Sequence, residues 1–136
     1  QYFLHSRMCT NQGYKRLAKR QHDESMEEMR HAVKLMDRML MLDGAPNMIR
    51  LEKVLAGATL PEMLQHDLAL EKRAVATLQD ALRVAFDVSD HVTRELFEHV
   101  LADEEEHIDW LEAEIGKIEA MGVENWLATQ QYGDED

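Results

Sequence analysis

The sequence contains few of the residues that interrupt helices, and almost no cysteine. Its 136 residues include two prolines, six glycines and one cysteine. Because proline and glycine break helices, their scarcity favours a compact, mostly helical protein. The single cysteine, Cys9, excludes an internal disulfide and is typical of a reducing compartment, so we expect a cytoplasmic protein.

Long apolar runs and an excess of basic residues are also missing. No stretch approaches the roughly 20 apolar residues that span a bilayer, and the opening QYFLHSRM does not have the form of a secretory signal. Only 15 Lys and Arg stand against 27 Asp and Glu, for a net charge of −12. This balance argues against a nucleic-acid surface. It suits a protein that attracts cations, although negative charge also simply keeps proteins in solution.

Apolar residues recur at intervals of three and four almost throughout, which predicts helices and no strands. We expect helices over about residues 1–16, 23–42, 60–86, 90–121 and 123–130. Gly13 is a possible end of the first helix, and Thr59 can cap the third. The length fits one domain over residues 1–136. The first helix is shorter than the next three, and we expect it to be truncated at its N-terminus.

Two of these helices carry the same metal-ligand spacing. EEMRHA at 27–32 contains Glu28 and His31, and EEEHID at 104–109 contains Glu104 and His107. Residues three apart lie on one helix face, so each pair can point at one metal. Carboxylate plus imidazole suits iron, manganese or zinc. The spacing alone is weak evidence for a metal site, because 16 glutamates and seven histidines produce nearly one such pair by chance.

The helix between these two pairs supplies a further candidate, Glu71. It lies mid-helix among apolar neighbours in LALEKRAV, where a carboxylate needs a partner. Dinuclear sites in four-helix bundles take two Glu-x-x-His helices and one glutamate from each remaining helix, with ferritin-like proteins as the type example. Glu71 precedes Glu104 by 33 residues (104 − 71). If the two halves are alike, the partner of Glu28 falls at position −5 (28 − 33), six residues before Gln1.

Five stretches together resemble the bacterioferritin family over nearly the whole chain: QYFLHSRM, HDESMEEMRHAVKLMDRMLMLDGAPN, EMLQHDLALEKRA, ADEEEHIDWLEAEI and MGVENWL. The resemblance implies an all-α, ferritin-like four-helix bundle with a short fifth C-terminal helix. It also implies a 24-subunit hollow shell built from two-fold dimers that share haem b. The expected function is oxidation of Fe²⁺ to Fe³⁺ by O₂ or H₂O₂ at a di-iron centre, with storage of the mineral in the shell.

The resemblance also assigns roles to individual residues. Glu28 and Glu104 would bridge the two irons, while His31, His107 and Glu71 would be terminal ligands. Five other positions are either assigned by the resemblance or depart from it. The full set is Tyr2 beside the centre, Met29 as haem ligand, and the unusual residues Asp23, His22 and Cys9 at a cavity-surface, a haem-pocket and a subunit-contact position. The implied partners are further copies of the chain and a ferredoxin-like electron donor, with a second subunit type left open.

Other interpretations remain open at this stage. Met26, Met29 and Met36 form a stripe that spacing alone assigns to a core or an interface. The chain could instead be a ferritin-like di-iron peroxidase that stores nothing, which a small dimer without a cavity would favour. It could also be a structural, haem-binding shell subunit with an inactive centre, if no upstream glutamate exists.

Overall fold

The computed structural model describes residues 1–132, which form five helices and no strand. Residues 133–136 of the predicted domain lie outside the described residues. The helices are α1 (Tyr2–Gln12), α2 (Lys15–Met41), α3 (Leu60–Asp87), α4 (His91–Met121) and α5 (Val123–Thr129). The predicted all-α class with a short C-terminal helix is therefore confirmed.

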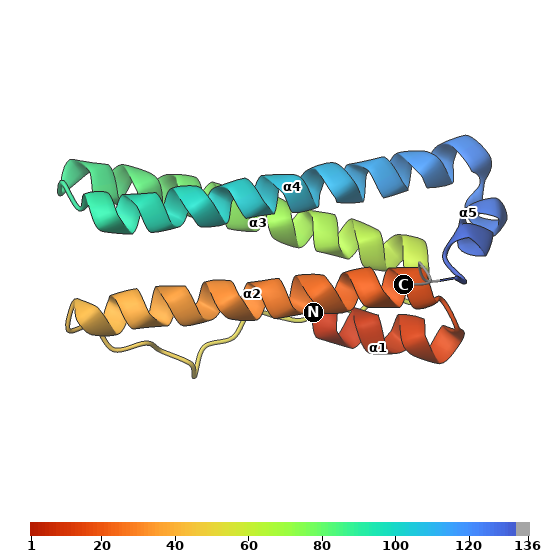
Figure 1. Ribbon diagram of the computed structural model, residues 1–136, viewed down its shortest axis with the longest axis horizontal. Coiled ribbons are helices and arrows are strands. Elements are labelled where there is room, and N and C mark those ends of the chain that lie inside the picture. Colours follow the sequence, from red (N-terminus) through yellow and green to blue (C-terminus); the bar gives the residue numbers. More distant parts are fainter. Residues whose placement is uncertain (133–136) are drawn as a thin grey trace.

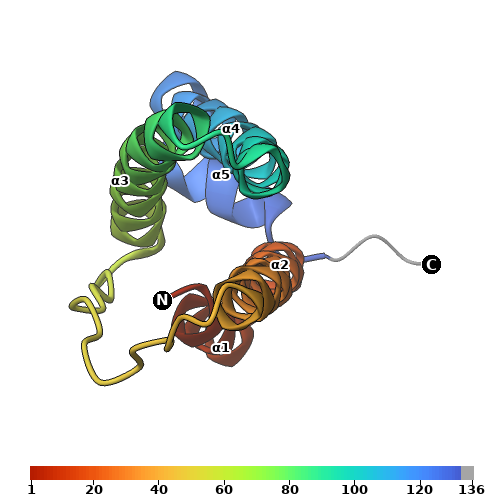
Figure 2. The same cartoon turned by 90° about the vertical axis from the view of Figure 1, so that its left-hand side faces the viewer.

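The helices pack as two pairs, α1 with α2 and α3 with α4 (Figures 1 and 2). The connection over residues 42–59 runs back along the bundle, so α3 points in the same direction as α2, while α1 and α4 point the opposite way (Figure 1). The short α5 lies across the end of the bundle where α4 finishes. This is a ferritin-like bundle in which α1, with 11 residues, is less than half as long as α2, α3 or α4.

The predicted start of the second helix is wrong. Gly13 ends α1 in the left-handed conformation at φ 85°, and α2 begins two residues later, at Lys15 rather than near Asp23. The segment KRLAKRQH contains few apolar residues, so its helical pattern is faint. Leu17, Ala18 and Gln21 nonetheless form its buried face. The polar Gln21 hides that face from an analysis of hydrophobic periodicity.

The other helix boundaries follow their capping residues as expected. Thr59 and Glu62 form a capping box at the start of α3, with proline in its first turn. The side chain of Asp90 accepts a hydrogen bond from the backbone N–H of Thr93 at the start of α4. Gly122, at φ 80°, ends α4. In the part of the chain that the structure describes, no helix has the length and apolar character to span a bilayer.

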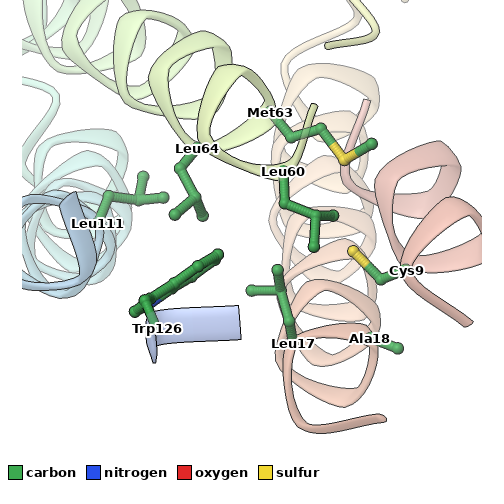
Figure 3. Close-up of a cluster of buried hydrophobic side chains, with 8 residues drawn as sticks. All are labelled: Cys9, Leu17, Ala18, Leu60, Met63, Leu64, Leu111 and Trp126. Atoms are coloured by element: carbon green, nitrogen blue, oxygen red, sulfur yellow. The ribbon is translucent and has the colours of Figure 1, made fainter. Parts of the chain in front are cut away.

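The apolar core lies at the α5 end of the bundle (Figure 3). Trp126 from α5 packs among side chains from the other four helices, and its indole N–H donates a hydrogen bond to Glu114 at 2.7 Å. The cluster comprises Cys9, Leu17, Ala18, Leu60, Met63, Leu64, Leu111 and Trp126. Cys9, expected near a subunit contact, is fully buried within this single chain. Burial raises the pKa of its thiol to about 12, so the thiol stays protonated.

Candidate metal centre

The middle of the bundle is buried but polar. Glu71 on α3 and Glu104 and His107 on α4 are almost inaccessible, as is His31 on α2. Glu28 on α2 is partly exposed. The helical spacing of three residues turns both Glu-x-x-His pairs into the same space between α2 and α4. The structure thus brings together all five ligand candidates named from the sequence.

Glu28 and Glu104 each present one oxygen to each histidine. Oε1 of Glu104 lies 3.4 Å from Nδ1 of His31, and its Oε2 lies 3.4 Å from Nδ1 of His107. The two oxygens of Glu28 lie 3.8 Å and 3.7 Å from the same two nitrogens. Glu71 faces one histidine only, with Oε1 3.9 Å from Nδ1 of His107. Glu28 and Glu104 thus each face both histidines, whereas Glu71 faces one.

Several polar atoms at this centre are buried and have no hydrogen-bond partner among the described residues. They are Nδ1 of His31 and of His107, Oε1 of Glu28 and Oε2 of Glu104. Buried polar atoms without partners are costly, and these four face one another. Ligand atoms of Glu28, Glu71, Glu104 and His107 lie within 4.8 Å of one another. The donor set, of carboxylate oxygens and imidazole nitrogens, is one that divalent iron accepts.

Tyr2 lies beside the centre, on α1. Its hydroxyl donates a hydrogen bond to Oε1 of Glu71, and its ring meets the His107 ring edge-on at 6.4 Å between centroids. Burial and the neighbouring Glu71 carboxylate raise the pKa of Tyr2, so its hydroxyl keeps its proton. The structure therefore places Tyr2 against the terminal carboxylate, at a distance at which it can orient that group.

The metal-free centre holds its protons tightly. The adjacent carboxylates of Glu104 and Glu28 raise the pKa of His31 to about 10. Burial acts to lower the pKa of His107, but the adjacent carboxylates of Glu104, Glu24 and Glu71 outweigh it and raise the value to about 12. Imidazolium cations thus compensate the buried carboxylates. A metal ligand must be deprotonated, so metal binding has to release these protons.

The two buried glutamates of the centre differ in protonation. Burial raises the pKa of Glu71 to about 7. Burial acts on Glu104 in the same direction, but the adjacent rings of His107 and His31 lower its pKa well below the usual range. Glu104, which faces both histidines, is thus ionised, and Glu71 sits near its titration point at neutral pH.

Three carboxylates around the centre were not predicted from the sequence. Glu24 on α2 is 2% exposed and contacts Nε2 of His107, and Glu27 lies 3.4 Å from the same nitrogen. On α4, Oδ2 of Asp103 lies 2.9 Å from Nε2 of His31. Glu24 could have been found, because it precedes Glu28 by four residues and His31 by seven, which places all three on one helix face. Nothing in the spacing marks Asp103.

The remaining candidates lie on the outside of the bundle. Met29, on α2, is 59% exposed, and Met26 and Val33 on the same helix are also largely exposed. Asp23 and His22 are exposed as well. Hydrogen bonding to Lys19 lowers the pKa of Asp23, so this surface carboxylate is ionised. Glu105 and Glu106 are exposed, because they turn away from the face that carries Glu104 and His107.

A helical bundle whose centre gathers two histidines and bridging carboxylates defines the class of dinuclear carboxylate bundles. A family model described as "Ferritin-like domain" matches residues 1–121. A protein named bacterioferritin from Mycobacterium avium is 44% identical over 128 residues, 94% of this chain and 80% of that protein. One from Streptomyces coelicolor is 43% identical over 95% of this chain and 77% of its own length.

A relative named bacterial ferritin, from Synechocystis sp., is 40% identical over 131 residues, which cover 96% of this chain and 84% of the relative. The similarity thus extends over almost all of the chain, and the family model spans the stretch that carries the centre. The chain belongs to the ferritin-like family and, within it, to the bacterioferritins.

Proposed function

We propose that this chain oxidises Fe²⁺ and stores the Fe³⁺ product, and that the centre between α2, α3 and α4 is its ferroxidase site. The observation that carries this proposal is the position of Glu28 and Glu104, each with one oxygen towards each histidine. Membership of the bacterioferritins supports iron storage as the wider role.

In this proposal the substrate iron replaces the protons held at the centre. Two Fe²⁺ ions bind to Nδ1 of His31 and of His107, and Glu28 and Glu104 bridge them. The histidines hold each ion without adding negative charge, while the carboxylates offset the charge of the ions. Each Fe²⁺ gives up one electron. One molecule of hydrogen peroxide takes both electrons and two protons to become two waters, whereas one molecule of dioxygen takes both electrons and two protons to become hydrogen peroxide.

Glu71 and Tyr2 complete the His107 side of this site. Glu71 faces His107 alone and so serves the ion at that histidine. Its pKa of about 7 lets it deprotonate as the ion enters. The Tyr2 hydroxyl holds one oxygen of Glu71 and so limits the positions that this carboxylate can take up. The His31 side has no equivalent of Glu71 among the described residues.

We propose that a glutamate at position −5, on an upstream extension of α1, serves the ion at His31. A cavity of about 370 Å³ opens beside His31. Apart from the site residues, it is lined mainly by apolar side chains, including Leu35, Leu70, Leu78 and Val100. Such a lining suits the apolar face of another helix.

The exposed part of α2 supports a haem site. Met29 offers a thioether, a recognised axial ligand of haem iron, and Met26 and Val33 offer apolar surface around it. At a two-fold axis one methionine meets its own copy, so Met29 from each of two chains would supply both axial ligands. Bound haem would provide one-electron transfer to stored iron, with the electrons delivered by a ferredoxin-like donor.

The decisive experiment loads the purified protein anaerobically with Fe²⁺ and then adds oxidant. Two ions bound per chain, rapid oxidation, and a 24-subunit particle that accumulates iron are the expected result. Glu104→Ala should abolish the rapid phase, whereas Glu112→Gln, which removes an exposed charge on the same helix, should not. A small dimer that consumes peroxide and accumulates no mineral would favour a peroxidase. A shell that binds haem but oxidises iron no faster than solution would mean a structural subunit.

A further inference from the structure

Each histidine of the centre has carboxylates facing both of its ring nitrogens. Their Nδ1 atoms face the bridging carboxylates, whereas their Nε2 atoms face carboxylates that no Glu-x-x-His pair supplies. Nε2 of His107 contacts Oε2 of Glu24, and Nε2 of His31 lies 2.9 Å from Oδ2 of Asp103. Each of these contacts crosses between α2 and α4, because Glu24 and His31 lie on α2 while Asp103 and His107 lie on α4.

A neutral imidazole has one N–H group and one lone pair, and which nitrogen carries the hydrogen is set by its hydrogen-bond acceptor. A carboxylate at Nε2 holds the hydrogen there. The lone pair is then on Nδ1, which has no hydrogen-bond partner in either histidine. Nδ1 is also the atom that faces Glu28 and Glu104. Once metal binding has displaced the second proton, each ring therefore presents its lone pair towards the dinuclear centre.

We propose that Glu24 and Asp103 are positioning residues, each of which fixes the tautomer and orientation of one histidine of the dinuclear centre, Glu24 for His107 and Asp103 for His31. The inference rests on the proposed function, because it assumes that Nδ1 of each histidine binds metal. Carboxylates that orient metal-binding histidines in this way increase the basicity of the ring as well as fixing its direction.

The Glu24–His107 pair is more enclosed than the Asp103–His31 pair. Glu24 forms an ion pair at each oxygen, Oε1 with Nη2 of Arg20 and Oε2 with Nε2 of His107, a nitrogen that also hydrogen-bonds to Oε2 of Glu27 at 3.4 Å. Arg20 is itself placed by Trp110, over whose ring its guanidinium lies at 5.0 Å from the centroid. The side chain of Asp103 is 23% exposed, and its second neighbour is the exposed His99 at 3.8 Å. The Glu24 pair is thus enclosed, whereas the Asp103 pair is open to water, so the Glu24 pair should contribute more.

A second reading treats these same carboxylates as metal ligands. Ligand atoms of Glu24, Glu27 and His107 lie close enough for an ion, and so do those of Glu27, His31 and Asp103. Both sets, however, use Nε2 of a histidine whose Nδ1 faces the dinuclear centre. A neutral ring has one lone pair and cannot supply both. The hydrogen-bonded arrangement needs no further deprotonation of the ring, so the geometry favours it.

The test is titration of the whole protein with Co²⁺, which reports its coordination through visible absorption and is not consumed by turnover. The protein is expected to bind two ions per chain. Glu24→Leu should weaken binding of the ion at His107 by about 10- to 100-fold and leave the affinity for the ion at His31 close to its original value. Asp103→Leu should weaken binding of the ion at His31, by a smaller factor. Glu24→Gln keeps an acceptor for the Nε2 hydrogen and should retain most of the affinity. Asp37→Asn, an exposed change on α2, should change nothing.

A double-mutant cycle separates positioning from general damage. If Glu24 acts through His107, then adding Glu24→Leu to His107→Ala should cost nothing further in the affinity for the ion that His107 serves. Arg20→Leu should weaken the same ion as Glu24→Leu, by a smaller factor.

Each other outcome has a definite meaning. Loss of both ions to the same degree in Glu24→Leu, or an additive cycle, would overturn the inference and leave the ferroxidase site standing. Loss of a third ion only would overturn it by making Glu24 a ligand. Failure of the unaltered protein to bind any Co²⁺ would overturn both the inference and the proposed function. If the leucine variants do not fold, Glu24→Gln decides, since an affinity loss as severe as that of His107→Ala would contradict a positioning role.

Discussion

Two regions of the interior, the Trp126 core at the α5 end and the metal centre in the middle of the bundle, are built from opposite chemistry. The core packs apolar side chains from all five helices around Trp126. The centre buries two histidines with several carboxylates, including Glu24, Glu71 and Glu104. Burial of apolar surface stabilises a fold without any ligand, whereas burial of carboxylates costs free energy unless a cation or hydrogen bond compensates it. The core holds the bundle together, whereas the centre buries carboxylates that a bound cation would compensate.

Removal of the central aromatic of the core should have the largest effect on stability. Trp126→Ala leaves a cavity and deprives Glu114 of the indole hydrogen bond. It should lower the free energy of unfolding by about 3–5 kcal/mol, measured by chemical denaturation of the metal-free protein. Tyr132→Ala, an exposed aromatic near the same end, should change stability by no more than about 0.5 kcal/mol. Equal effects of the two substitutions would remove the distinction between core and surface at this end.

Neutralisation of a bridging carboxylate should impair Fe²⁺ oxidation strongly and stability only slightly. Glu104→Gln preserves the shape of the side chain but removes a ligand from both irons, so rapid Fe²⁺ oxidation should fall to the rate seen in solution. The metal-free fold should lose far less stability than in Trp126→Ala. Stopped-flow oxidation and denaturation curves measure the two quantities. Glu105→Gln, the exposed neighbour, is the matched control. A variant with normal oxidation would show that Glu104 does not bridge the irons.

The centre should make metal-free stability depend on pH. A pKa raised in the folded state gives stability that is present below the unfolded pKa and is lost as pH rises through the folded value. Glu71, raised from 4.5 to about 7, should therefore cost stability between these values, and His31, raised from 6.5 to about 10, should continue the loss. Bound metal should reverse the trend, because it replaces the protons.

Denaturation at several pH values, with and without Zn²⁺, measures this dependence. Glu71→Gln removes one titrating group and should flatten the part of the curve between pH 4.5 and about 7. The Trp126 core contributes no such slope, so Leu64→Ala should lower the whole curve by a constant amount. A metal-free protein whose stability rises over this pH range would contradict the assignment of protons to the centre.

The smallest effect on the fold should come from the exposed face of α2. Met29→Leu should abolish haem absorbance while stability changes by no more than about 0.5 kcal/mol, since the side chain is largely exposed. The particle should still assemble, as judged by sedimentation. Met41→Leu, at the exposed end of the same helix, should keep its haem. Retention of full haem by Met29→Leu would exclude Met29 as the axial ligand.

The sequence alone determined the helical class and most helix ends. Few prolines and glycines left long periodic segments, and local capping chemistry at Thr59, Asp90 and Gly122 marks where they begin or stop. These are short-range effects, so the residues that cause them lie within a few positions of their consequence. The start of α2 escaped prediction, because the buried face of its first turns includes the polar Gln21.

For the metal centre, the sequence predicted which carboxylate and histidine share a face on each helix, since Glu28 with His31 and Glu104 with His107 are three residues apart. It could not predict that Glu24 meets His107 or that Asp103 meets His31. Those contacts depend on how α2 and α4 lie against each other, and nothing within either helix encodes it. Which nitrogen of each ring is left for metal was therefore decided only by tertiary structure, because packing between helices sets the partner of the other nitrogen.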